Sequence, residues 1–303
     1  MCARMTLRTL DARLNDVERK LEVVKEGLSR LADGSSADDD LSYPEPVAYS
    51  LGRERASSLY HERFLNLLDA GEATIIYTAA FALALLSGTE EHQQLVQPLR
   101  NRPIALGTWA SVIEQSLNSM LAAEGSTVSV LASCLLAGFR RANGRPTSAA
   151  RFLLEELVTI RNEVRGHGAA RTEGMYEDLY RRYASGVHDS LRSLAFLKLP
   201  LVRVEDIDVA GEHMHYGVRV LMGPVARIER FMSSVRMPRG ATCVWDKGEV
   251  LVSLGDIVRY QSCPACNFDH TFFLDQATSK MAKYKAYAGS HGFQAPPVSW
   301  ACQ

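Results

Sequence analysis

The sequence predicts an α+β protein, with helices in its first two thirds and a small antiparallel β domain at its end. Through most of residues 7–198, apolar residues recur every three or four positions, as on one face of a helix. The pattern changes at Leu199-Pro200, after which apolar and polar residues alternate and β-branched residues are frequent. The chain has 303 residues, enough for two ordinary domains with a real core.

Residues 1–32 are predicted to form a coiled-coil helix. Their leucines and valines alternate between spacings of three and four, at Leu7, Leu10, Leu14, Val17, Leu21, Val24, Leu28 and Leu31. A repeat of 3.5 residues favours pairing with a second chain, because a lone helix would expose this row. The alternative is an amphipathic helix that folds back on its own domain. Residues 33–46 are small, acidic and proline-bearing, which predicts a linker.

Residues 47–198 are predicted to form an all-helical bundle of roughly five helices. Its first part, residues 53–88, predicts either two helices or one long broken helix, with Gly71 and Gly88 as the interruptions. Residues 199–303 follow as the small antiparallel β domain, with turn signals in the stretches "AGEH", "DKGE" and "SLGD".

The β domain contains the stretch "SCPACNFDH", in which Cys263 and Cys266 are separated by two residues. This spacing is similar to one knuckle of a zinc ribbon, and a structural zinc ion needs four ligands. Further ligands could come from Cys243, His270, His291 or Cys302, although none has the standard spacing of a second knuckle. The simplest interpretation is therefore a zinc-ribbon-like hairpin that has lost its metal, and a bound structural zinc ion is the alternative. A redox pair is a third interpretation, but its βαβ context is absent.

The net charge and the hydropathy pattern indicate which binding partners and cellular locations we expect. The net charge is −1, so nucleic acid would have to bind at a local basic patch rather than through bulk attraction. We expect no membrane association, because the longest apolar run, residues 74–88, is too short to cross a bilayer and is typical of a core helix. The first residues are charged and form no apolar signal core, which predicts a cytoplasmic protein with reduced cysteines.

The stretch "LVTIRNEVRGHG" places two arginines, an asparagine and a histidine at the end of an apolar helix. Arg161 and Arg165 are four residues apart and share one helical face. Glycines flank His167, so the helix is expected to bend or end there, which lets the imidazole swing back beside Arg161. Asn162 completes a compact cluster.

These residue types suit the cleavage of RNA without a metal. Histidine moves protons near neutral pH, as the attack of a ribose 2′-hydroxyl requires. The planar fork of arginine matches phosphate oxygens and stabilises their charge in the transition state. A nearby amide can orient the imidazole.

The pattern "RNEVRGH" on a helical bundle resembles the motif of HEPN domains, and the resemblance covers about residues 50–198. It implies a metal-independent endoribonuclease, used as a toxin or in antiviral defence, that leaves 2′,3′-cyclic phosphate and 5′-hydroxyl ends. By this resemblance Arg161 stabilises phosphate, His167 is the acid or base and Asn162 orients it. Arg165 is not part of the motif, but from the same helical face it could add a substrate contact, as could Arg171 just beyond. The partners would be RNA, a second subunit across a shared cleft, and a regulatory protein; catalysis would need no cofactor.

Three other interpretations remain open. Cations are favoured at any helix C-terminus, where they satisfy the last carbonyl groups and the helix dipole. The protein could be a non-catalytic interaction or sensor module. It could also bind nucleic acid without cutting it, with the arginines as phosphate clamps.

Overall fold

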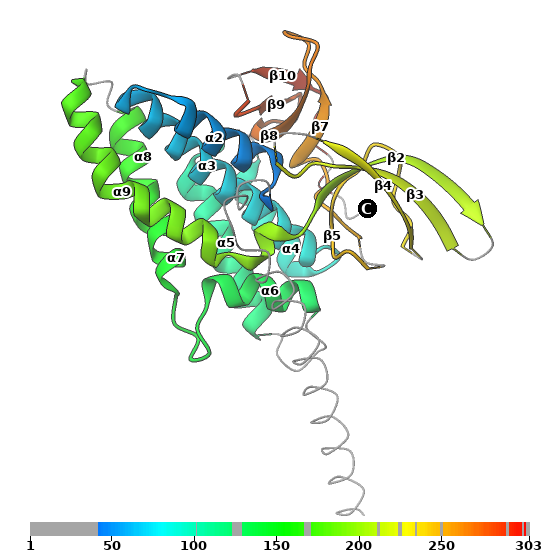
Figure 1. Cartoon of the computed structure of the whole chain (residues 1–303). Coiled ribbons are helices and arrows are strands. Elements are labelled where there is room, and N and C mark those ends of the chain that lie inside the picture. The colour runs from blue at the N-terminus through cyan, green and yellow to red at the C-terminus, as the bar shows by residue number, and fades with distance from the viewer. Residues whose placement is uncertain are drawn as a thin grey trace, which may run out of the picture.

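The computed structural model shows a mixed α+β protein whose helices lie beside two antiparallel sheets (Figure 1). The structure describes residues 42–100, 102–122, 129–166, 171–210, 213–223, 226–233, 235–248, 251–288, 291–298 and 300. The predicted coiled coil at residues 1–32 and most of the predicted linker lie outside these residues.

The helices begin two residues before the predicted start of the bundle. Pro44 precedes the first described helix, and a proline near a helix start is compatible with the missing N–H. The helices are α2 (Glu45–Ala56), α3 (Tyr60–Leu85), α4 (Glu90–Val96), α5 (Leu106–Ala122), α6 (Val130–Phe139), α7 (Ser148–Arg151), α8 (Leu157–Gly166) and α9 (Glu173–Ser193). Short 3-10 helices lie at Gln97–Leu99 and Ala195–Lys198, and a π-helical turn, Phe152–Glu156, joins α7 to α8.

Helix α3 is the centre of the bundle and packs against α2, α5 and α9. It is one continuous helix of 26 residues, so the predicted break at Gly71 is wrong, whereas Gly88, with a φ of 88°, lies beyond its end. Gly71 lies where another helix crosses: a Cβ there would overlap the side chain of Leu157 at the start of α8. The glycine therefore serves the close approach of two helices rather than a chain break.

Helix α3 is also the one described helix that is long and apolar enough to cross a membrane. It is longer than the apolar run at residues 74–88 on which the sequence prediction was based. Its most apolar 18-residue stretch is 89% buried inside the protein, which is the environment of a core helix.

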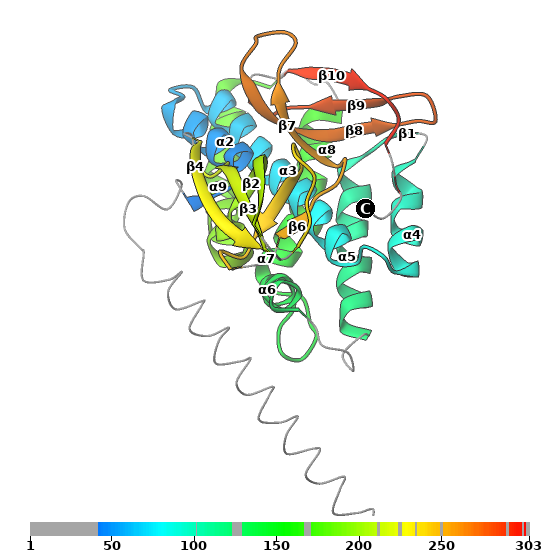
Figure 2. The same ribbon diagram turned by 90° about the vertical axis from the view of Figure 1, so that its right-hand side faces the viewer.

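The strands form two five-stranded antiparallel sheets, of order β4-β3-β2-β5-β6 and β1-β8-β9-β10 with β7 also paired to β8 (Figure 2). Their bounds are β1 (Arg102–Pro103), β2 (Leu201–Ala210), β3 (His213–Val220), β4 (Arg227–Ser233), β5 (Thr242–Trp245), β6 (Leu251–Ser253), β7 (Val258–Ser262), β8 (Asp269–Ala277), β9 (Ala282–Lys285) and β10 (Gly292–Ala295). The alternation after Leu199 thus corresponds to strands, although it gave no indication of two sheets.

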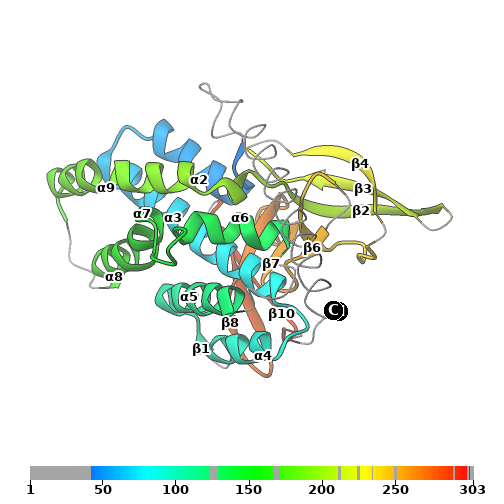
Figure 3. The ribbon, with the colours of Figure 1, turned by 90° about the horizontal axis from the view of Figure 1, so that it is seen from below.

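Helices and sheets share one hydrophobic core. Strand β1 comes from the loop between α4 and α5 but pairs with β8, and the amide of Glu45 in α2 donates to the carbonyl of Leu221 beside β3. Buried apolar side chains run continuously from the helices into both sheets, among them Trp109, Phe196, Val218 and Phe273. Seen from below, sheet β7–β10 lies against the bundle while β2, β3 and β4 extend away from it (Figure 3). The change of pattern at Leu199 therefore marks a change of secondary structure inside one packed unit.

Candidate functional site

The arginines of the "RNEVRGH" stretch lie on the face of α8 that is turned toward α3. Nε of Arg161 is 3.2 Å from Oε1 of Glu72, and Nη1 of Arg165 is 2.8 Å from the same oxygen. Glu72 follows Gly71, so the close crossing of α3 and α8 brings its carboxylate within reach of the next two turns of α8. The shared helical face predicted for the two arginines agrees with this common partner.

Glu72 is the centre of a charged cluster that extends to the β region. Its side chain is fully buried, and its second oxygen lies 3.3 Å from the hydroxyl of Tyr287 and 3.7 Å from Nζ of Lys285. A buried carboxylate is costly unless charges and hydrogen bonds compensate it, and these four partners provide that compensation. Burial, and then the charge of Glu72, raises the pKa of Tyr287 well above its ordinary value.

Arg161 and Arg165 differ in which of their guanidinium nitrogens are already occupied by hydrogen bonds or ion pairs. Arg165 uses both terminal nitrogens, since Nη2 lies 2.7 Å from Oδ1 of Asp69. Arg161 donates from Nη1 to Oδ1 of Asn162 at 3.3 Å and keeps 27% of its side chain exposed. Within the part of the chain that the structure describes, Nη2 of Arg161 has no hydrogen-bond partner. Arg161 is thus the arginine of this pair that can still receive a ligand.

The paired charges also change proton affinities. Burial lowers the affinity of the Arg165 guanidinium for its proton, but Glu72 and Asp69 outweigh it, so the pKa of Arg165 is raised. Burial raises the pKa of Asp69 even though Arg165 opposes the shift. Arg165 therefore stays charged, and its charge is compensated by the buried Glu72 and the partly buried Asp69.

Of the remaining predicted site residues, Arg171 closes the C-terminal end of α8. Its guanidinium donates to the carbonyl oxygens of Glu163 at 2.8 Å and of Val164 at 3.2 Å, which is the helix-end role that cations commonly take. Its predicted contact with substrate stays a prediction. His167, the predicted acid or base, lies outside the described residues.

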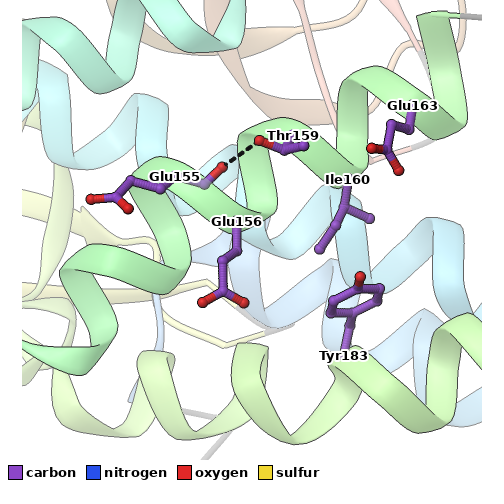
Figure 4. Close-up of a pocket in the computed structure, with 6 residues that line it drawn as sticks. All are labelled: Glu155, Glu156, Thr159, Ile160, Glu163 and Tyr183. Atoms are coloured by element: carbon purple, nitrogen blue, oxygen red, sulfur yellow. Dashed lines mark hydrogen bonds between the residues drawn. The ribbon is translucent and has the colours of Figure 1, made fainter.

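A pocket of about 260 Å³ lies on the opposite face of α8, between this helix and α9 (Figure 4). Its lining is acidic and consists of Glu155, Glu156, Thr159, Ile160, Glu163 and Tyr183. Three glutamates in one pocket repel a phosphate backbone. This pocket is therefore unsuited to a polyanionic ligand.

A second site lies in the sheet of β7–β10. The side-chain donor atoms of Cys263, Cys266 and His291 all lie within 4.8 Å of one another, which makes this group a candidate metal centre. Sγ of Cys263 is 3.1 Å from Nδ1 of His291. Of the other predicted ligands, Cys243 is buried in strand β5 and is not a member of this group, and Cys302 lies outside the described residues.

The backbone around Cys263 favours its thiolate, the form that binds metals. Burial opposes ionisation, but hydrogen bonds from the amides of Ala265 and Cys266 and from His291 outweigh it, and the pKa of Cys263 falls to about 7. Asn267 adopts a φ of 61°, as expected of the residue that follows a CxxC knuckle. No such donor from the described residues faces Cys243, and burial raises its pKa to about 12.

Several of these residues were missed by reasoning from the sequence. Glu72 is a single acid within the apolar stretch "AGEATIIYTAAFALAL", and a charge in such a run signals a buried, paired group. Tyr287 and Lys285 carry no signal, because only the packing of β9 against the bundle brings them to Glu72.

Comparison of the chain with protein-family models, with curated proteins and with solved structures finds no match. The resemblance to HEPN domains therefore depends on the motif and its helical context alone.

Proposed function

We propose that the protein is a metal-independent endoribonuclease of the HEPN type that acts as a dimer, as a toxin or an antiviral effector. One observation supports this most: Glu72 and Asn162 hold Arg161, yet its side chain is 27% exposed and its Nη2 has no hydrogen-bond partner among the described residues. An arginine fixed in this way can bind a phosphate without losing much side-chain freedom on binding.

The proposed chemistry is an internal transesterification. His167 takes the proton of a ribose 2′-hydroxyl, whose oxygen attacks the adjacent phosphorus atom. Arg161 stabilises the negative charge of the phosphorane, and Asn162 orients the participating groups. The bond from phosphorus to the 5′-oxygen breaks, that oxygen accepts a proton, and the products carry 2′,3′-cyclic phosphate and 5′-hydroxyl ends.

The test is cleavage of total RNA and tRNA in the presence of EDTA. His167→Ala and Arg161→Gln should each reduce the rate by about 100-fold or more, the usual effect of removing an acid–base group or a charge-stabilising donor. Arg181→Gln is the matched control, because Arg181 is 70% exposed and its partner among the described residues is Glu177 on its own helix. Circular dichroism and the oligomeric state should be unchanged in each variant. Cleavage that survives both changes, or that requires a divalent metal, contradicts the proposal.

A second function has one specific observation in its favour. The charges of Arg161 and Arg165 are compensated by Glu72 and Asp69, which weakens the attraction of the site for a polyanion. This arrangement suits a non-catalytic interaction module in which the cluster only joins α3, α8 and the β region. Such a module cuts no RNA and is harmless when overproduced, so growth on overexpression of the wild type separates the two functions.

The candidate metal centre has a different proposed role. Structural zinc is the metal that fits, because two thiolates and an imidazole are the donors of closed zinc sites in proteins. Cys263, Cys266 and His291 would hold it. The ion would stabilise the sheet, and the proposed cleavage of RNA uses none of its chemistry.

A further inference from the structure

Two hairpin turns meet at one end of the sheet β7–β10. One turn, residues 263–268, joins β7 to β8, and the other connects β9 to β10, with residues 286–288 and 291 as its described part. Strands β8 and β9 are antiparallel, with Phe273 opposite Lys285, so the start of β8 and the end of β9 lie at the same edge. The topology therefore brings His291 to Cys263 although 28 residues separate them.

A fourth donor lies at the same place. His270, the second residue of β8, directs Nε2 toward Sγ of Cys266 at 3.3 Å. The rings of His270 and His291 stand edge to face, with their centroids 5.6 Å apart. Each thiol thus has its own imidazole, while His270 stands outside the group of three residues whose donor atoms all lie within 4.8 Å of one another.

We propose that His270 is the fourth ligand and closes a Cys2His2 zinc site with Cys263, Cys266 and His291. The inference rests on the proposal of structural zinc. With zinc–sulfur and zinc–nitrogen bonds of about 2.3 and 2.0–2.1 Å, sulfur and nitrogen ligands on a tetrahedron stand roughly 3.5 Å apart. The two contacts between sulfur and imidazole nitrogen, at 3.1 and 3.3 Å, are close to this spacing.

In the proposed site, two histidines thus take the place of the second CxxC knuckle of a zinc ribbon. A zinc ribbon takes two ligands from each of two CxxC knuckles, whereas here one knuckle is matched by single histidines on β8 and before β10. A site with four protein donors leaves no coordination position for water, so its role is structural rather than catalytic.

The closed site has a consequence for the charged cluster around Glu72. The turn that ends at His291 also contains Tyr287, and the strand before it ends at Lys285; both side chains contact Glu72. A metal that fixes this turn therefore helps to hold Tyr287 and Lys285 against the bundle. The zinc site becomes one support of the carboxylate that orients Arg161.

Metal binding by the full-length protein tests the inference. Wild-type protein should contain about one zinc per chain, and the Co²⁺-substituted form should show the intense visible bands of tetrahedral coordination. His270→Ala should weaken zinc binding in a chelator competition by about 100-fold or more and shift the Co²⁺ spectrum, because water replaces a protein ligand. His215→Ala is the control, since His215 is exposed on β3 in the other sheet.

The outcomes separate the two proposals. If wild-type and His270→Ala proteins bind zinc equally and give the same Co²⁺ spectrum, His270 is not a ligand, although structural zinc remains supported. If wild-type protein reconstituted with zinc retains none, both metal proposals fail and the ribonuclease proposal is untouched. Should His270→Ala not fold, His270→Gln replaces it, and the same comparison of affinity and spectrum decides.

Discussion

Replacing Glu72 by glutamine tests the physical account of the cluster beneath Arg161. Glutamine has nearly the same shape as glutamate, so the change removes the charge without opening a cavity. Arg161, Arg165 and Lys285 then lose a fully buried carboxylate that lies 3.2, 2.8 and 3.7 Å from their nitrogens. Three cations would be left near one another, with Asp69 and Asp275 as the remaining acidic partners among the described residues.

The expected cost follows from the burial of these groups. Removing one partner of a buried ion pair costs about 3–5 kcal/mol. The three cations are 27–32% exposed, and water compensates part of the loss, so we expect about 2–4 kcal/mol. With a urea m-value of about 3 kcal/mol/M for a chain of this size, the unfolding midpoint should fall by roughly 1 M.

Urea unfolding followed by circular dichroism measures this shift. The matched control is Glu177→Gln, which removes a carboxylate from the exposed pair with Arg181 and should cost at most about 0.5 kcal/mol. A double variant, Glu72→Gln with Arg165→Met, should lose less than the sum of its parts, because both changes disrupt the same pair. A Glu72→Gln protein within 0.5 kcal/mol of wild type would refute the reasoning.

Three further changes follow from the structure. Gly71→Ala should destabilise the protein by about 1–3 kcal/mol because the new Cβ meets Leu157. Gly52→Ala, with open space around it in α2, should be neutral or stabilising by up to about 1 kcal/mol. Thermal unfolding compares the two variants, and equal effects would contradict the crossing of α3 and α8 at Gly71. Burial, together with the hydrogen bond to Glu54, raises the pKa of Tyr180 to about 12. The folded state therefore binds the Tyr180 proton more tightly than the unfolded state does, and this contribution to stability is present below pH 10 and lost as the pH rises toward 12. Tyr180→Phe should make the alkaline fall in stability shallower. An unchanged slope would argue against the hydrogen bond between Tyr180 and Glu54. Incubation with a strong chelator should lower the midpoint of thermal unfolding in the wild type but not in Cys263→Ser, which lacks a proposed ligand; an equal fall in both proteins would point to a general effect of the chelator.

The sequence by itself determined the helical first part, the strands after Leu199 and the grouping of Arg161 with Arg165. These depend on local periodicity, and the residues that carry a period of 3.6 or 2 are near one another in the chain. The CxxC knuckle was also visible, because Cys263 and Cys266 and the turn between them are contiguous. The sequence offered His270 and His291 among four possible further ligands but could not choose between them, since His291 reaches Cys263 only through the pairing of β8 with β9.

Only the tertiary structure decided which groups surround the arginines. Glu72 and Tyr287 are 215 residues apart, and no local rule relates an acid in the middle of α3 to a tyrosine after β9. Their contact results from packing: the Cβ-free surface of Gly71 admits α8, and one shared core holds the sheet of β7–β10 against the same helix. The cations and hydroxyl groups that the fold brings within reach compensate the buried carboxylate, because burial without them is too costly.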